Sequence, residues 1–195
     1  MDANYRDLIQ RVSVLQPPMH IFGGVAEDVL LEGSLDRPHG DLDVVVRRME
    51  LAERVEQART LGFASLEVYY EPLPGRPLVM GGISDGLRLE FGIIDEDTSG
   101  FYFVAGTPDG QLQRIELTDE LFTHPSVDID GTAVHVVSPL ALYQMRDALI
   151  QLGTFGAPRD KDVTVQARLR EQLLEEDDRD VLAPAMSPLT PLEPR

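Results

Sequence analysis

The chain contains no cysteine, a single lysine and no long apolar run. The absence of cysteine excludes disulfide bonds and thiolate zinc sites and fits a reducing compartment. No apolar stretch approaches the roughly 20 residues that a membrane-spanning helix needs, and the first thirty residues lack the pattern of a secretory signal. We therefore expect a cytoplasmic protein that neither spans nor enters a membrane.

Positive charge is also scarce, since 17 Lys and Arg stand against 34 Asp and Glu in 195 residues, a net charge of −17. A polyanion such as tRNA or DNA would be repelled unless a local basic patch overrode this balance. The arginines are interleaved with acids and form no visible basic stripe. The composition thus favours a cationic partner, or none, over nucleic acid.

Apolar spacing and turn residues predict helices near both ends of the chain and strands between them. The expected helices cover 2–16, 25–32, 49–61, 139–151 and 161–175. The expected strands cover 19–22, 41–46, 66–70, 77–81, 87–94, 101–105, 111–117 and 133–137. This order predicts an α+β fold in which a mixed sheet is flanked by helices.

The chain divides into three expected parts. Residues 1–137 form the core, and 138–176 form a C-terminal helical segment that packs on it. Residues 177–195 begin with an acidic run and have four prolines among the last twelve residues. Because little periodicity supports a packed element there, we expect a mobile tail.

Two short patterns carry chemical information. Gly23 and Gly24 end a strand and open a helix, where the backbone can approach a phosphate and the helix dipole favours it; a plain strand-to-helix turn is the alternative. Asp41 and Asp43 stand two apart, so both carboxylates project from one strand face and can share a divalent cation such as Mg²⁺. The same spacing recurs elsewhere in this acidic chain, so by itself it also fits a solvated strand end.

Taken in order, these parts resemble the nucleotidyltransferase superfamily that includes DNA polymerase beta. They are most similar to the branch of aminoglycoside and lincosamide nucleotidyltransferases, in which Gly-Gly-x-Ala-x-Asp is followed by Arg-x-His-x-Asp-x-Asp. The matching residues here are Gly23, Gly24, Ala26, Asp28, Arg37, His39, Asp41 and Asp43. The resemblance implies the nucleotidyltransferase fold.

The third acid of the family usually comes from a neighbouring strand, and the resemblance assigns it to Glu90. In the segment 87–94 the apolar residues alternate, which leaves Glu90 on the opposite face. Relatives commonly have aspartate at this place. The role of Glu90 therefore stays open between metal ligand, base for the acceptor hydroxyl and solvated strand residue, with Asp95 as the reserve candidate.

Residues 138–169 resemble the two-helix segment that closes the active-site cleft in this branch, with Arg146 on the first helix and Lys161 opening the second. A cation in the first helical turn opposes the helix dipole, so a phosphate partner would explain Lys161; a solvated lysine is the alternative. His39 is expected to bond its own loop and orient the aspartates. The expected nucleotide-binding residues are Gly23, Gly24, Arg37, His39, Arg146 and Lys161.

The resemblance implies that Asp41, Asp43 and Glu90 hold one or two Mg²⁺ ions as catalytic and metal-binding residues. The expected reaction transfers an NMP, taken to be AMP, from a nucleoside triphosphate to a hydroxyl of a small, aminoglycoside-like molecule and releases pyrophosphate. One alternative is a toxin-type enzyme acting on tRNA or protein. Another is a non-catalytic nucleotide-binding module, suggested by the glutamate at position 90. The sequence does not indicate an oligomeric state.

Overall fold

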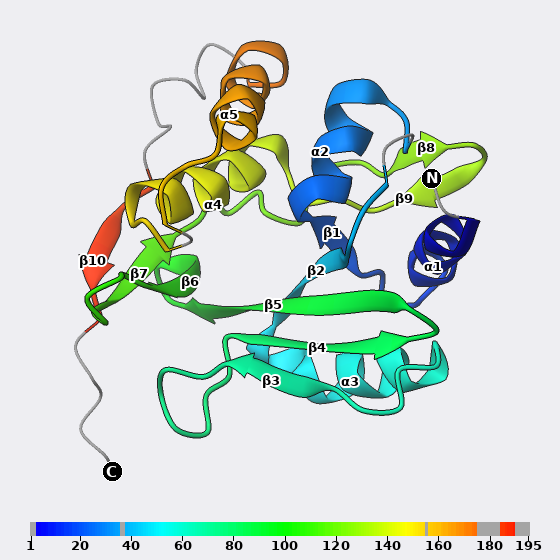
Figure 1. Cartoon of the computed structure of the whole chain (residues 1–195), viewed down its shortest axis with the longest axis horizontal. Coiled ribbons are helices and arrows are strands. Elements are labelled where there is room, and N and C mark those ends of the chain that lie inside the picture. Colours follow the sequence, from blue (N-terminus) through cyan, green and yellow to red (C-terminus); the bar gives the residue numbers. More distant parts are fainter. Residues whose placement is uncertain (1–2, 36–37, 155, 175–183, 190–195) are drawn as a thin grey trace.

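The computed structural model describes residues 3–35, 38–154, 156–174 and 184–189. In this part the chain has the expected α+β architecture, a mixed sheet flanked by helices (Figure 1). The helices are α1 (Ala3–Ser13), α2 (Gly23–Glu32), α3 (Leu51–Thr60), α4 (Pro139–Gln151) and α5 (Asp160–Gln172), with a short 3₁₀ turn, η1, at Arg48–Glu50. The strands are β1 (His20–Phe22), β2 (Leu42–Arg47), β3 (Glu67–Tyr70), β4 (Val79–Ser84), β5 (Leu87–Asp97), β6 (Gly100–Gly106), β7 (Leu112–Glu116), β8 (Val127–Ile129), β9 (Thr132–Val134) and β10 (Met186–Pro188).

The main sheet has eight strands built around the long strand β5. Its path is β1-β2-β5-β6-β7-β10, and β4 pairs with β5 and carries β3 on its outer edge. Strands β2 and β5 run parallel, and this register places Asp43 opposite Glu90. On the other side of β2, Phe22 of β1 stands opposite Asp43. Strands β8 and β9 form a separate hairpin.

The two faces of the β3–β4–β5 region differ in how they are covered. Leu89 and Phe91 of β5 are fully buried, as the alternation in the sequence predicts. A Cβ built at Gly82 of β4 would meet Phe63 and Leu66, from the segment that follows α3, so this face packs on the α3 side. In Figure 1, α3 lies behind β3 and β4, and no helix of the described residues lies in front of them. Glu90, at opposite parity to Leu89 and Phe91, faces the uncovered side.

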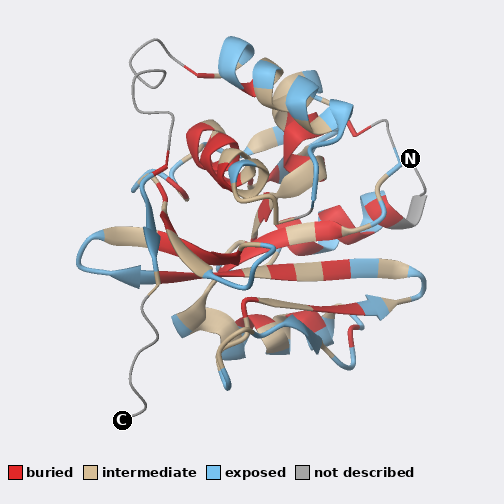
Figure 2. Ribbon diagram, turned by 60° about the vertical axis from the view of Figure 1, so that its left-hand side comes forward, coloured by how far each residue is buried: buried red, intermediate tan, exposed pale blue. Residues whose placement is uncertain are grey.

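The core lies between the sheet and the helices that pack on it. Figure 2 shows the buried residues gathered in the middle of the sheet and on these helices. Ser138 caps α4 by accepting a hydrogen bond from the backbone N–H of Ala141 (3.2 Å), and Pro139 follows at the first helical position. None of the helices in the described ranges is long and apolar enough to cross a membrane.

The C-terminal residues differ in part from the expected tail. Residues 184–189 are described, and Met186–Pro188 forms β10, which pairs antiparallel with β7. A three-residue strand that contains proline is too short to give a periodic pattern, so the sequence did not indicate it. The remainder of the expected tail, 177–183 and 190–195, lies outside the described residues.

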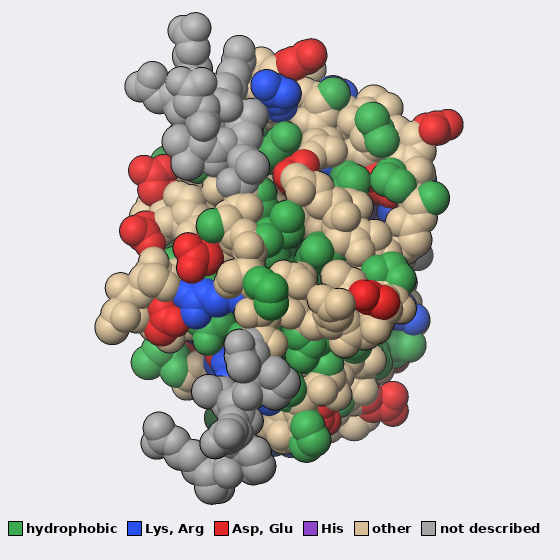
Figure 3. All heavy atoms as spheres, turned by 90° about the vertical axis from the view of Figure 1, so that its left-hand side faces the viewer, with side chains coloured by type: hydrophobic (Ala, Val, Ile, Leu, Met, Phe, Trp, Pro, Cys, Tyr) green, Lys and Arg blue, Asp and Glu red, His purple; other side chains and the backbone are tan. Residues whose placement is uncertain are grey.

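On the face shown in Figure 3, the few basic side chains lie among acidic ones.

Candidate active site

Three carboxylates from two neighbouring strands meet on the uncovered side of the sheet. Asp41 immediately precedes β2, Asp43 lies in β2, and Glu90 lies opposite Asp43 in β5. One carboxylate oxygen from each residue lies within 4.8 Å of the other two. The structure thus brings together the three acids that the sequence singled out.

The cluster is electrostatically costly without a cation. Burial, followed by the charges of Asp41 and Glu90, raises the pKa of Asp43 to about 8. Burial and the charge of Asp41 also raise the pKa of Glu90, although Arg88, whose Nη1 lies 3.3 Å from Glu90 Oε1, partly offsets this. A divalent cation would remove the repulsion, and three hard carboxylate oxygens are the donors that Mg²⁺ prefers. The donor set therefore fits the metal that the resemblance implies.

The first residue of α2 lies directly against this cluster. Gly23 has a φ of 65°, and a Cβ built on it would overlap the Oδ2 atom of Asp43. Glycine is required here because any side chain would displace the carboxylate and would also strain the backbone. The N-cap residue Phe22 makes no capping hydrogen bond through its side chain, and Gly24 follows in the same turn. The predicted phosphate-facing corner and the paired aspartates therefore form one site.

His39 connects the loop before Asp41 to α2. Its Nε2 atom lies 2.9 Å from Oδ2 of Asp28, and the two side chains are only 7% and 12% exposed. The sequence predicted that His39 bonds its own loop, whereas its ring contacts Asp28 of α2; that it orients the aspartates stays a prediction. Asp28 matched the sequence motif, but its role as the partner of His39 became visible only in the structure. Arg37, the other expected nucleotide ligand in this loop, lies outside the described residues.

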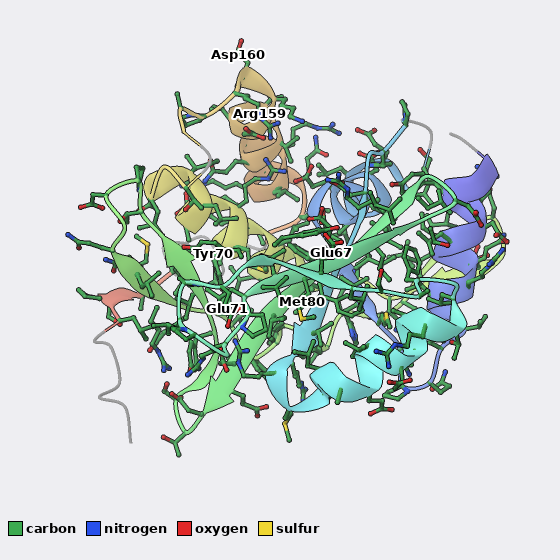
Figure 4. The ribbon with its side chains drawn as sticks, turned by 60° about the horizontal axis from the view of Figure 1, so that its bottom comes forward. Glu67, Tyr70, Glu71, Met80, Arg159 and Asp160 are labelled. Atoms are coloured by element: carbon green, nitrogen blue, oxygen red, sulfur yellow. The ribbon has the colours of Figure 1, made fainter. Side chains whose placement is uncertain are left out.

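The two basic residues expected to bind nucleotide lie in different surroundings. Arg146 of α4 forms ion pairs with the buried Glu27 of α2 and with Asp162 of α5, the latter at 3.0 Å. Burial lowers the pKa of Arg146, while Asp162 acts in the opposite direction. Lys161 is exposed at the start of α5 and forms no ion pair with any described residue. Its neighbour Asp160 is labelled in Figure 4.

Asp95, the reserve candidate for the third acid, is buried outside the carboxylate cluster. Its Oδ1 atom accepts a hydrogen bond from Nε of Arg48 at 2.6 Å, and Nη2 of Arg76 lies 3.0 Å from the same oxygen. Both guanidinium groups neutralise this carboxylate within the fold. Glu90, not Asp95, is therefore the acid that joins the two aspartates.

Comparisons with known proteins support the fold. The solution structure of the antibiotic-resistance factor ANT(2'')-Ia matches with a TM-score of 0.59 and 19% identity, covering 93% of this chain and 90% of that one. The crystal structure of ANT(2'')-Ia in complex with adenylyl-2''-tobramycin matches with a TM-score of 0.58 and 18% identity, covering 92% and 95% of the two chains. A scan against protein-family models and a search of curated proteins found no match. At these identities the likeness shows an aminoglycoside nucleotidyltransferase-like fold, as the sequence motifs predicted.

Proposed function

We propose that this protein is a Mg²⁺-dependent nucleotidyltransferase that moves an NMP, with AMP as the first candidate, from a nucleoside triphosphate to a hydroxyl of a cationic aminosugar. The observation that carries the proposal is the meeting of Asp41, Asp43 and Glu90 beside Gly23 at the start of α2. This arrangement offers carboxylates for a metal and a helix N-terminus for phosphates at one place.

The roles of the residues follow from their positions. Asp41, Asp43 and Glu90 would hold the metal, and the start of α2 would receive the phosphate chain against a backbone that has no side chain at Gly23. Bound Mg²⁺ supplies charge neutralisation on the phosphate and a lower pKa for the acceptor hydroxyl. The hydroxyl oxygen forms a bond to the α-phosphorus, the bond from that phosphorus to the leaving pyrophosphate breaks, and the hydroxyl proton passes to a base.

Glu90 is the acid best placed to take that proton. Of the three carboxylates, only Glu90 lies on β5, which pairs with β4. Asp43 lies in β2 and Asp41 just before it, on the side of β5 away from β4. An acceptor that approaches over β4 meets Glu90 first. His39 would act indirectly, by holding the aspartate loop through Asp28.

The acceptor class follows from charge and from the fold comparison. A net charge of −17 attracts polycations, and the crystal structure with the same fold contains an adenylylated aminoglycoside, adenylyl-2''-tobramycin. A toxin-type enzyme acting on tRNA would be expected to present a basic stripe, and the face in Figure 3 has none. Tobramycin is therefore the first acceptor to test.

A nucleotide-binding experiment and a turnover experiment together test the proposal. Thermal unfolding is followed with ATP, GTP, CTP or UTP, each with and without Mg²⁺, for the wild type and for Asp43→Asn. A ligand at 100 times its Kd adds about 2.7 kcal/mol, which for a chain of this size raises Tm by roughly 5 to 10 °C. We expect a Mg²⁺-dependent shift that the variant loses, and pyrophosphate release when tobramycin is added. A shift without pyrophosphate release from any nucleotide, with tobramycin or with other hydroxylated acceptors, would favour a non-catalytic nucleotide-binding module instead.

A further inference from the structure

Beside Glu90, an exposed aromatic ring lies on a strand glycine. A Cβ built at Gly81 of β4 would stand 2.7 Å from Cε2 of Tyr69 and 3.2 Å from Cγ of Glu90. The Tyr69 ring and the Glu90 side chain therefore flank the same backbone position. Glycine inside a strand weakens the strand and is explained where another group approaches the backbone closely. At Gly81 that group is Tyr69, which is nevertheless 42% exposed.

The sheet register continues the row of site residues across this glycine. Asp43, Glu90, Gly81 and Glu67 stand opposite one another in β2, β5, β4 and β3, so all four face the same side. Adjacent strands lie about 4.8 Å apart, which places the backbones of Glu67 and Glu90 roughly 10 Å apart. Gly81, covered by the ring of Tyr69, stands between them in the row.

Glu67 is free to bind a ligand. It lies exposed at the start of β3, and no described side chain pairs with it. Glu71, just beyond the other end of β3, differs because its carboxylate accepts a hydrogen bond from the backbone N–H of Gly75. Figure 4 labels Glu67 and Tyr70 at the two ends of this strand. A second partly exposed ring, Tyr70, places its hydroxyl against Gly106 of β6.

We infer that Glu67, Tyr69 and Gly81 form the acceptor subsite, which binds a hydroxylated ring bearing an ammonium group. The inference rests on the proposed function. The ring of the acceptor packs on the outer side of the Tyr69 ring, which itself covers Gly81. Its ammonium group pairs with Glu67, and its hydroxyl points to Glu90. An ammonium group gains from both the carboxylate and the face of the tyrosine ring. A neutral sugar loses both contributions, so this subsite selects cationic acceptors.

The test compares Glu67→Gln with Glu53→Gln. Glu53 is an exposed acid on α3, behind the sheet, so its removal changes the net charge equally without touching the subsite. With tobramycin as acceptor and ATP as donor, we expect Glu67→Gln to raise the KM for tobramycin about three- to tenfold, with kcat and the KM for ATP unchanged. Glu53→Gln should change none of these values. Tyr69→Ala should raise the same KM, and Tyr69→Phe should restore it because it keeps the ring.

Calorimetric titration of tobramycin into the nucleotide-free protein separates this inference from the proposed function. Binding that Glu67→Gln weakens, without transfer in any variant, would support the subsite and refute the transferase proposal. Transfer with a KM for tobramycin that neither Glu67→Gln nor Tyr69→Ala changes would refute the subsite and leave the transferase proposal intact. If tobramycin neither binds to the protein nor is modified by it, the subsite is also refuted. Equal melting temperatures of the variants and the wild type would show that the fold is unaffected.

Discussion

Replacing Asp43 with asparagine should stabilise the metal-free protein and, at the same time, remove its metal site. The pKa of Asp43 is raised from 3.8 to about 8 because the carboxyl is buried beside two other acids. A raised carboxyl pKa means that the folded state holds the proton more tightly than the unfolded chain does. Below about pH 4 the Asp43 carboxyl is protonated in both states and costs no stability. As the pH rises from about 4 to about 8, the free energy of unfolding falls progressively because only the unfolded chain releases this proton.

The size of the effect follows from the same values. At 1.36 kcal/mol per pKa unit, the ionisable carboxyl costs about 4 kcal/mol at pH 7 relative to a neutral group of the same shape. Relaxation and water entry reduce such penalties in proteins, so we expect a gain of about 2 to 4 kcal/mol for Asp43→Asn. For a chain of this length, that gain raises Tm by roughly 5 to 15 °C.

Thermal unfolding in EDTA at pH 5, 7 and 9 measures this prediction. The difference in Tm between Asp43→Asn and the wild type should grow with pH, while Asp85→Asn, at an exposed turn, should show no such growth. Mg²⁺ with ATP should then stabilise the wild type alone. The reasoning is refuted if Asp43→Asn is no more stable than the wild type at pH 9, or if the difference does not depend on pH.

Three further substitutions test the surroundings of the site. Gly23→Ala should lower Tm and weaken Mg²⁺ binding because its Cβ would overlap the carboxylate of Asp43. The control Gly33→Ala has a similar φ of 62° but open space around it, so it should cost about 1 to 2 kcal/mol of stability and leave Mg²⁺ binding unchanged. Arg146→Met should lower the free energy of unfolding in urea by about 2 to 4 kcal/mol because it removes a charged partner of the buried Glu27. Arg168→Met, whose ion pair is exposed, should cost less than about 1 kcal/mol. His39→Ala should cost about 1 to 3 kcal/mol of stability and also weaken Mg²⁺ binding; unchanged Mg²⁺ affinity in a folded variant would exclude a positioning role.

The sequence predicted most helices and strands to within a few residues because their apolar periodicity is strong. The family resemblance grouped Glu90 with the two aspartates, and strand alternation predicted only that Glu90 faces away from the apolar residues of β5. Two strands were missed, Val127–Ile129 and Met186–Pro188, since three residues carry no measurable period. Helix α2 begins at Gly23, two residues before the expected start, because glycines contribute nothing to an apolar pattern.

Relationships between distant elements could not be predicted in the same way. The pairing of Arg146 with acids on α2 and α5 depends on how three helices pack. The family resemblance had suggested only a nucleotide ligand at this position. The approach of Tyr69 to Glu90 depends on the register of three strands and on the glycine between them. Neither residue spacing nor composition indicates which residues of distant elements lie in contact, whereas the structure shows these contacts directly.

The most direct test of the account is mass spectrometry of tobramycin after incubation with the protein, ATP and Mg²⁺. We expect the wild type, but not Asp43→Asn, to form a product heavier by one AMP group together with an equal amount of pyrophosphate. Product formed at the wild-type rate by Asp43→Asn would contradict the assignment of the carboxylate cluster as the catalytic metal site.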